Sequence, residues 1–257
     1  MIDLHVHVLP GIDDGPATLE SSLALARDAV ADGVEAMAAT PHVREDYPTA
    51  ADTMTRLLGE LRDAFAAELL PLELLPGGEI GLDRVRSSSV AELQVFALGG
   101  NPRYLLVEFP YHGWPLDLPD LLFRLVAQGV TPVLAHPERN DVVQEAPLRL
   151  QPLVASGCLV QLTAAAAAGR LGRRPRATAM KLLQLELAHV LGSDAHSAGL
   201  RGAGLSAAAA AVGGGKLGDW LTRGMPAAIV AGTELPIRPD RPRSGRGRRG
   251  RLSRRPD

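Results

Sequence analysis

The sequence is poor in cysteine and in long apolar runs. It contains a single cysteine, Cys158, in 257 residues, which excludes an intrachain disulfide and a zinc site built on several thiolates. No uncharged apolar stretch reaches the roughly 18 residues that a membrane-spanning helix needs. The first residues also lack the basic and apolar regions of a signal peptide. We therefore expect a cytoplasmic protein with no transmembrane segment.

Basic residues are few in most of the chain and concentrated at its end. Only two lysines are present, whereas residues 238–257 hold nine arginines and two aspartates. Without that segment the chain carries 18 basic and 27 acidic residues, a net charge of −9. This acidic body argues against a broad nucleic-acid-binding surface. The Arg-, Pro- and Gly-rich composition predicts a disordered basic tail at 238–257, after one domain at 1–237.

Short apolar runs alternate with amphipathic stretches throughout the domain. The runs predict strands at residues 2–8, 34–40, 72–76, 104–109, 131–136, 158–163 and 189–194. Helical patterns lie at residues 18–32, 50–70, 117–128, 145–156 and 176–187. Alternating strands and helices predict an α/β fold with parallel strands. The number of units favours a TIM-like (β/α) barrel over an open doubly wound sheet.

Histidine is scarce, yet two histidines open the chain in the segment HVHVLPGIDDG at 5–15. Residues i and i+2 of a strand face the same side, so His5 and His7 project together. Two imidazoles aimed at one point suit a borderline divalent metal ion. Taken alone, such a pair is more often two ordinary surface histidines.

Residues able to bind a metal also lie at or just after the ends of the predicted strands. They are Asp14 after the first strand, His42 in ATPH, Glu79 in GGEI, Glu108 in VEFP, His136 in HPERN, and Asp194 and His196 in GSDAH. The sixth predicted strand is the exception, because its Gln161 and Thr163 are poor ligands. Barrel enzymes build their active sites at the carboxyl ends of strands. The repeated placement therefore predicts a metal centre.

Other polar residues have simpler interpretations. Asp13 is expected to form a turn before Gly15, and His189 is expected to lie away from the metal centre. Cys158 begins a buried strand, and Ala164 stands where a C-x5-R phosphatase motif needs its arginine. Cys158 is therefore a poor candidate for a nucleophile.

The segments HVHVLPGIDDGP, ATPH, GGEI, VEFP, HPERN and GSDAHS, in this order, resemble the polymerase-and-histidinol-phosphatase (PHP) superfamily. They are most similar to its bacterial manganese-dependent protein-tyrosine phosphatases, which are associated with capsule and exopolysaccharide synthesis. The resemblance covers roughly residues 1–205. It implies a distorted (β/α)7 barrel with about three metal ions. It also implies hydrolysis of phosphotyrosine on proteins such as the tail of a bacterial tyrosine kinase, by attack of a metal-bound hydroxide.

The resemblance also implies a set of ligands and phosphate-binding arginines. One ion would be held by His5, His7, Glu79 and Asp194, a second by Glu79, Glu108 and His136, and a third by Asp14, His42 and His196. Arg139 and Arg201 match the arginines that contact the phosphate. Manganese comes from the resemblance, and the donors also suit iron, zinc or cobalt. The chain departs from the family pattern in AAAAAGRLG at 164–172 and LRGAG at 200–204.

The charge of such a centre suits a phosphate ester. Three divalent ions and four carboxylates leave a surplus of about +2, which matches a phosphomonoester of about −1.5 to −2 at pH 7. Alternatives remain a small-molecule phosphatase of the histidinol phosphatase type, a nucleic-acid-processing phosphoesterase, and a metal-binding regulator without catalysis. In the loop PYHGWP at 110–115, Tyr111 or Trp114 is expected to stack on the substrate ring, unless both simply pack over the barrel mouth.

Overall fold

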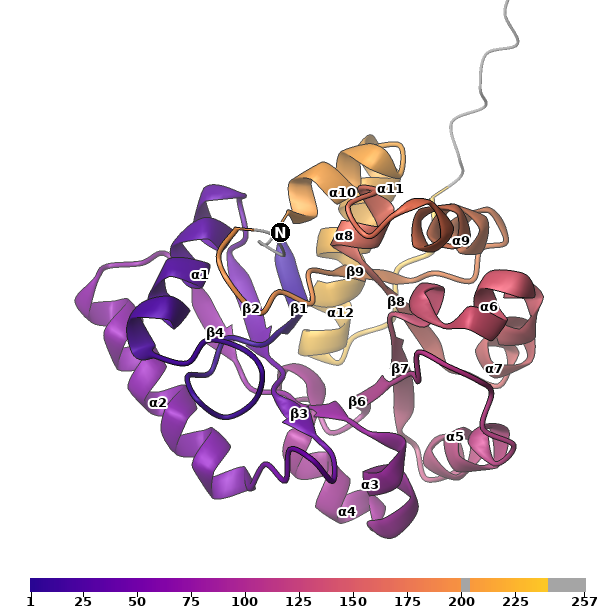
Figure 1. The fold of residues 1–257 in the computed structure, drawn as a ribbon, viewed down its shortest axis with the longest axis horizontal. Coiled ribbons are helices and arrows are strands. Elements are labelled where there is room, and N and C mark those ends of the chain that lie inside the picture. Colours follow the sequence, from indigo (N-terminus) through magenta and orange to yellow (C-terminus); the bar gives the residue numbers. More distant parts are fainter. Residues whose placement is uncertain (200–203, 240–257) are drawn as a thin grey trace, which may run out of the picture.

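The computed structural model describes residues 1–199 and 204–239. Within these ranges the strands are β1 (Ile2–Val6), β2 (Ala36–Ala39), β3 (His42–Val43), β4 (Glu73–Leu75), β5 (Glu79–Ile80), β6 (Tyr104–Glu108), β7 (Thr131–Ala135), β8 (Leu159–Thr163) and β9 (Val190–Gly192). They occupy the interior, and helices surround them (Figure 1).

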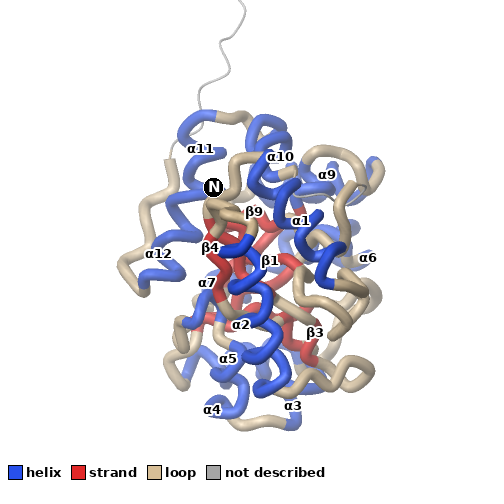
Figure 2. The backbone as a smooth tube through the Cα atoms, turned by 90° about the vertical axis from the view of Figure 1, so that its left-hand side faces the viewer, coloured by secondary structure: helices blue, strands red, loops and turns tan. Residues whose placement is uncertain are grey.

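The α-helices of the described residues are α1 (Leu19–Ala31), α2 (Ala51–Ala67), α3 (Leu82–Ser87), α4 (Val90–Leu93), α5 (Leu118–Ala127), α6 (Asp141–Glu145), α7 (Gln151–Ala155), α8 (Ala164–Ala167), α9 (Arg173–Gln184), α10 (Leu205–Ala211), α11 (Gly215–Asp219) and α12 (Met225–Ala231). Short 3-10 turns and one π-helical turn, Trp220–Gly224, complete the regular structure. Seen from the side, the helices form an outer layer over the strands (Figure 2). None of the described helices is both long enough and apolar enough to cross a membrane.

The described strands form two parallel sheets. The smaller has the order β1-β2-β4, and the larger has the order β3-β5-β6-β7-β8-β9. The sheets meet where the segment after β9 returns to β1. There the amide of His7 donates to the carbonyl of Ala195 at 2.9 Å, and the amide of Asp194 donates to the carbonyl of His5 at 2.8 Å. The α/β class and the parallel strands are confirmed, and the strands of the described residues do not form one continuous ladder.

Apolar residues explain why the strands lie inside. Leu105, Leu106 and Val107 of β6 are all at most 1% exposed, so both faces of this strand are covered. Parallel strands with helices on both faces typically have such continuous apolar runs. Local capping residues determine where helices begin. In α1, for example, Thr18 caps the first turn by accepting a hydrogen bond from the amide of Ser21.

All seven predicted strands are present, and two short strands were missed. These are β3 and β5, which pair with each other so that His42 lies opposite Glu79. Strands of two residues have no periodicity, and only pairing with neighbours reveals them. The helical pattern at 145–156 became a 3-10 turn followed by α7. The predicted tail lies outside the described residues from 240 onward.

Candidate metal centre

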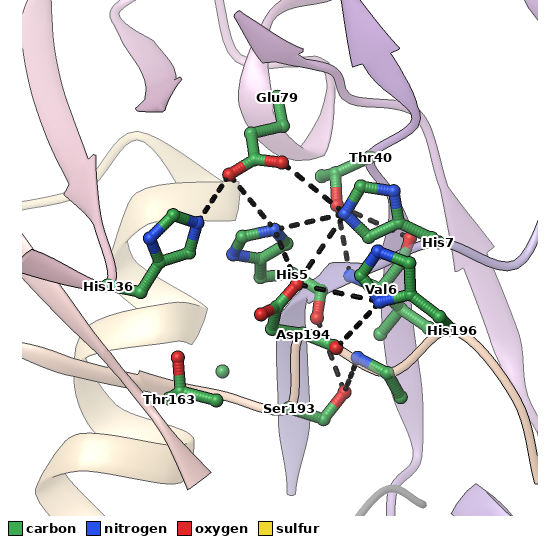
Figure 3. A network of polar contacts seen from close by, with 12 residues as sticks. His5, Val6, His7, Thr40, Glu79, His136, Thr163, Ser193, Asp194 and His196 are labelled. Atoms are coloured by element: carbon green, nitrogen blue, oxygen red, sulfur yellow. Dashed lines mark hydrogen bonds and ion pairs between the residues drawn. The ribbon is translucent and has the colours of Figure 1, made fainter. Parts of the chain in front are cut away.

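The candidate ligands gather at the carboxyl ends of the strands. Eight of the nine are fully or largely buried, and Asp14, with 45% of its side chain exposed, lies at the open side. Figure 3 shows His5, His7, Glu79, His136, Asp194 and His196 pointing toward one another from several strands and the loops that follow them. The structure therefore brings together residues that lie up to 191 positions apart in the sequence.

Imidazole rings form one side of this cluster. The Nε2 atoms of His5 and His7 face each other at 3.3 Å, as expected for side chains at i and i+2 of one strand. The ring of His7 stacks on that of His196, with centroids 3.9 Å apart, and lies 4.5 Å from the ring of His42. Four imidazoles at these separations place several nitrogen lone pairs around a small volume.

Glu79 lies at the centre of the cluster. Its Oε1 atom is 2.8 Å from His136 Nε2, and its Oε2 atom is 2.9 Å from His42 Nδ1. The Nε2 atoms of His5 and His7 lie 3.5 and 3.4 Å from its oxygens. Burial alone would raise the pKa of Glu79, but the surrounding imidazoles hold that pKa well below its ordinary value. The carboxylate is therefore charged and able to bridge cations.

The distances divide the ligands into overlapping groups. The groups of close donor atoms are His7, Asp14, His42 and His196; His5, Glu79 and His136; His5, His7 and Asp194; and His42, Glu79 and Glu108. The first contains the whole set that the family resemblance implies for the third ion, together with His7. Glu79 shares groups with both Glu108 and His136, although these two do not share one group.

The donor set fits divalent cations. His136 Nδ1 is buried and forms no hydrogen bond with any described residue, and the contact of Glu79 Oε2 with His42 Nδ1 is an ion-pair contact without hydrogen-bond geometry. Burial, followed by the charge of Glu79, raises the pKa of Glu108. Two adjacent buried carboxylates and unsatisfied nitrogen atoms are costly unless a cation accepts their lone pairs. Mixed imidazole and carboxylate ligands suit manganese, iron, zinc or cobalt.

Asp13 orients His7, a role beyond the turn that its position indicated. One carboxylate oxygen accepts from the Gly15 amide at 2.9 Å, which is the predicted turn. The other lies 2.7 Å from His7 Nδ1 and accepts from the His42 amide at 3.0 Å. An ionised carboxylate only accepts, so His7 Nδ1 carries the proton and its Nε2 atom faces the cluster.

Protons in the cluster compete with cations. Burial would lower the pKa of His7, but contacts with Asp13 and Glu79 outweigh it and raise that pKa to about 10. Burial and the charge of His7 lower the pKa of His196 to about 4. A ligating imidazole must be unprotonated at the ligand atom, so cation binding releases the proton from His7 Nε2.

Gln161 orients His5 in a similar way. Its side-chain nitrogen donates to the carbonyl of Leu162 at 2.8 Å, so its oxygen faces His5 Nδ1 at 3.0 Å. His5 therefore donates through Nδ1 and presents Nε2 to the cluster. Gly192 makes this approach possible, because a Cβ atom there would lie 2.9 Å from both His5 Cβ and Gln161 Nε2. β8, which corresponds to the sixth predicted strand, thus contributes an orienting residue in place of a ligand.

Two of the candidate ligands have strained backbones. His136 and Asp194 adopt positive φ angles of 39° and 52°. Left-handed conformations of residues other than glycine cost roughly 1–3 kcal/mol, and surrounding contacts must enforce them. The amide of His136 donates to the Gln161 carbonyl at 3.0 Å. Such strain is concentrated at functional sites, and it cannot be predicted from the residue types at these two positions.

Arginine residues border the cluster. Arg139, with 17% of its side chain exposed, donates to Asp194 Oδ2 at 2.7 Å. Arg201 lies outside the described residues. Arg44 was not predicted, and its guanidinium contacts Glu108 Oε1 at 2.6 Å. Arg44 follows His42 by two residues, so in an extended segment both side chains point to the same side. This spacing was the signal by which the sequence could have indicated Arg44.

The remaining polar candidates lie elsewhere. Burial raises the pKa of the Cys158 thiol to about 11, which agrees with its assignment as a poor nucleophile. His189 packs 6.4 Å from the ring of Trp220, and burial lowers its pKa to about 4. Trp114 packs edge-on against Phe109. In contrast, the ring of Tyr111 lies 5.4 Å from that of His136.

We expect Asp13→Asn to weaken metal binding about 10- to 100-fold, the usual effect of losing a partner of a ligating histidine. Asparagine can still accept from the Gly15 amide but cannot accept from His7 and His42 as well. Calorimetric titration of metal-stripped protein with Mn²⁺ measures the change. Asp52→Asn, at an exposed position of α2, is the matched control. An affinity equal to that of the control would refute the orienting role.

The fold and the cluster together define an α/β protein with a candidate polynuclear metal centre at the carboxyl ends of its parallel strands. Residues 1–223 match the family described as "Capsular polysaccharide synthesis, CpsB/CapC". The chain belongs to this family.

Named relatives and a solved structure agree with this assignment. Tyrosine-protein phosphatase YwqE of Bacillus subtilis is 35% identical over 198 residues, which cover 77% of this chain and 78% of the relative. Tyrosine-protein phosphatase CpsB of Streptococcus agalactiae is 27% identical, with 78% and 85% covered. A crystal structure from the work on YwqE of Bacillus subtilis and CpsB of Streptococcus pneumoniae, described as metal-dependent tyrosine phosphatases, superimposes with a TM-score of 0.86. It is 31% identical and covers 94% of this chain and 100% of its own.

Proposed function

We propose that this chain is a metal-dependent phosphomonoester hydrolase that removes phosphate from tyrosine residues of proteins. The convergence of buried imidazoles and carboxylates on Glu79 is the observation that carries this proposal. Arg139 at the edge of that cluster supplies a cation suited to phosphate oxygens. The relatives named tyrosine-protein phosphatases support the choice of phosphotyrosine as the substrate.

We propose that the nine residues hold about three ions in the arrangement that the family resemblance implies. His5, His7, Glu79 and Asp194 would hold one ion, Glu79 would also hold a second together with Glu108 and His136, and Asp14, His42 and His196 would hold the third. Manganese is the proposed metal. When bound, the ions supply positive charge for the phosphate oxygens and lower the pKa of water.

The residues of the chain itself then have distinct tasks. Glu79 fixes the positions of the ligands around it, and Asp13 and Gln161 keep His5 and His7 in the required tautomers. Arg139 binds the phosphate oxygens and stabilises the charge that develops on them. Arg201 is proposed to share this task. Asp14 is the most exposed member, so the centre is open to solvent on its side.

The chemistry of the leaving group also favours phosphotyrosine as the substrate. A tyrosine hydroxyl has a pKa of about 10, far below that of an aliphatic alcohol, so its phenolate leaves with less help from an acid. Because most of the candidate ligands are buried, the site favours a phosphate carried on a long side chain. The proposed partner is the tail of a bacterial tyrosine kinase in the cytoplasm, in line with a family named for capsular polysaccharide synthesis.

We also propose that residues 1–237 form one phosphatase domain of distorted-barrel architecture. The bridge between Val6 and Ala195 supports this, because it joins the first strand of the small sheet to the end of the large one. A barrel that is interrupted elsewhere still directs the carboxyl ends of its strands to one mouth.

A substrate panel tests the proposed function. We expect the Mn²⁺-supplemented chain, residues 1–257, to hydrolyse phosphotyrosine peptides about tenfold or more faster than matched phosphoserine peptides. Histidinol phosphate and single-stranded DNA represent the two alternative activities. Phosphate release should be negligible with both. Efficient cleavage of histidinol phosphate without phosphotyrosine cleavage would overturn the substrate assignment.

A further inference from the structure

A pocket adjoins the metal centre on the side of Glu108. It has a volume of about 430 Å³, within the range typical of small-molecule sites. Arg44 and Glu108 line it, and Leu82, Pro110 and Tyr111 contribute apolar walls. Because Glu108 belongs to both, a group held in the pocket lies next to the metal ligands.

We propose that this pocket is an aryl subsite that holds the ring of the phosphotyrosine leaving group, with Tyr111 as its specificity-determining residue. The proposal rests on the proposed function, which names the phosphate ester but assigns no residue to its ring. Aromatic rings bind in apolar pockets through burial and through offset or edge-on contacts with other rings.

Tyr111 connects the pocket to the phosphate-binding side of the centre. Its ring lies 5.4 Å from that of His136, and the guanidinium carbon of Arg139 lies 4.4 Å from its centroid. Tyr111 is 39% exposed, so part of its surface remains available. A phosphate bound by Arg139 therefore places an attached ring within reach of Tyr111.

The two arginines that line the pocket are paired with carboxylates, so they favour a neutral ring over an anion. Arg44 is paired with Asp46 at 2.8 Å and with Glu108 at 2.6 Å. Arg86 is paired with Asp117 at 2.6 Å. With these cations engaged by neighbouring carboxylates, the apolar walls offer the main gain on binding.

A second pocket with aromatic lining is a poorer choice. It has a volume of about 460 Å³ and is lined by residues that include Trp114, Phe123 and Arg149. None of the candidate metal ligands lines it. Trp114 is covered by Phe109 on one side and faces the guanidinium of Arg149 at 4.8 Å. Of the two aromatic residues that the sequence singled out, the structure therefore favours Tyr111.

Binding of two phosphonates to the Mn²⁺-loaded full chain tests the subsite without requiring turnover. Phenylphosphonate carries the ring and methylphosphonate lacks it. We expect the unmodified protein to bind phenylphosphonate more tightly by about threefold to tenfold, the range for an aromatic contact. Tyr111→Ala should remove this preference, and Tyr111→Phe should retain it. Phe123→Ala, an exposed aromatic truncation on α5, should leave it unchanged.

The outcomes separate the subsite from the proposed function. Equal affinity of the unmodified protein for both phosphonates, or an unchanged preference in Tyr111→Ala, would overturn the subsite even if phosphotyrosine is hydrolysed. A Tyr111-dependent preference for phenylphosphonate supports the subsite even if the protein proves inactive toward phosphotyrosine, a result that would reject the proposed function alone.

Discussion

Replacing Glu79 with alanine is expected to cause the largest loss of metal binding and turnover of any single change. The side chain contacts four imidazoles and is completely buried. Removing one partner from a buried charge cluster costs about 3–5 kcal/mol, and about 1.4 kcal/mol corresponds to a tenfold change in affinity. We therefore expect the affinity for the bridged ions to fall about 10²- to 10⁴-fold.

Glu79→Gln separates the loss of charge from the loss of packing. Glutamine keeps the volume of the side chain but has only one acceptor oxygen and no charge. It should therefore lose metal and activity nearly as fully as alanine. Glu73→Gln, at an exposed position of β4, is the control. Elemental analysis, calorimetric titration and phosphatase assays measure the effect. Full metal content and normal turnover in Glu79→Gln would exclude the bridging role.

Replacing Arg139 with alanine is expected to lower turnover about 10²- to 10³-fold, the usual effect of removing one preorganised donor from a charge-stabilising site. Its guanidinium is partly exposed at the edge of the cluster, and one nitrogen is held by Asp194 at 2.7 Å. This contact orients the side chain, and its remaining N–H groups are available to phosphate oxygens. Metal content should stay close to that of the unmodified protein.

Arg139→Lys refines this prediction. Lysine keeps the charge but lacks the planar fork that donates to two oxygens together, so only part of the activity should return. Arg149→Ala removes an exposed arginine outside the centre and should have little effect. If Arg139→Ala loses metal in proportion to its activity, then Arg139 supports Asp194 and does not act on the phosphate.

The ligand types were predictable because they follow strand ends in the sequence. His5 and His7 share a strand face, and the residues of ATPH, VEFP and GSDAH follow apolar runs that form strands as predicted. Parallel pairing brings such ends to one edge, so local patterns were sufficient to predict a common site.

Other features depended on contacts between distant segments. Gln161 was interpreted only as a poor ligand, because its role depends on β8 placing it against His5. Asp13 follows His7 by six residues, but its contact with His42 needs the turn and a neighbouring strand. Tyr111 and Trp114 lie in one loop, and only packing separates the ring beside His136 from the ring beside Phe109.

The central claim is that this chain hydrolyses phosphotyrosine with metal ions held by the cluster around Glu79. The most direct measurement is phosphate release from a phosphotyrosine peptide by the full chain, first as purified, then after metal removal, and finally after addition of Mn²⁺. We predict that activity disappears with the metal and returns with Mn²⁺, with more than one ion bound per chain. Undiminished hydrolysis by protein with no detectable metal, or no hydrolysis under any of the three conditions, would contradict the account.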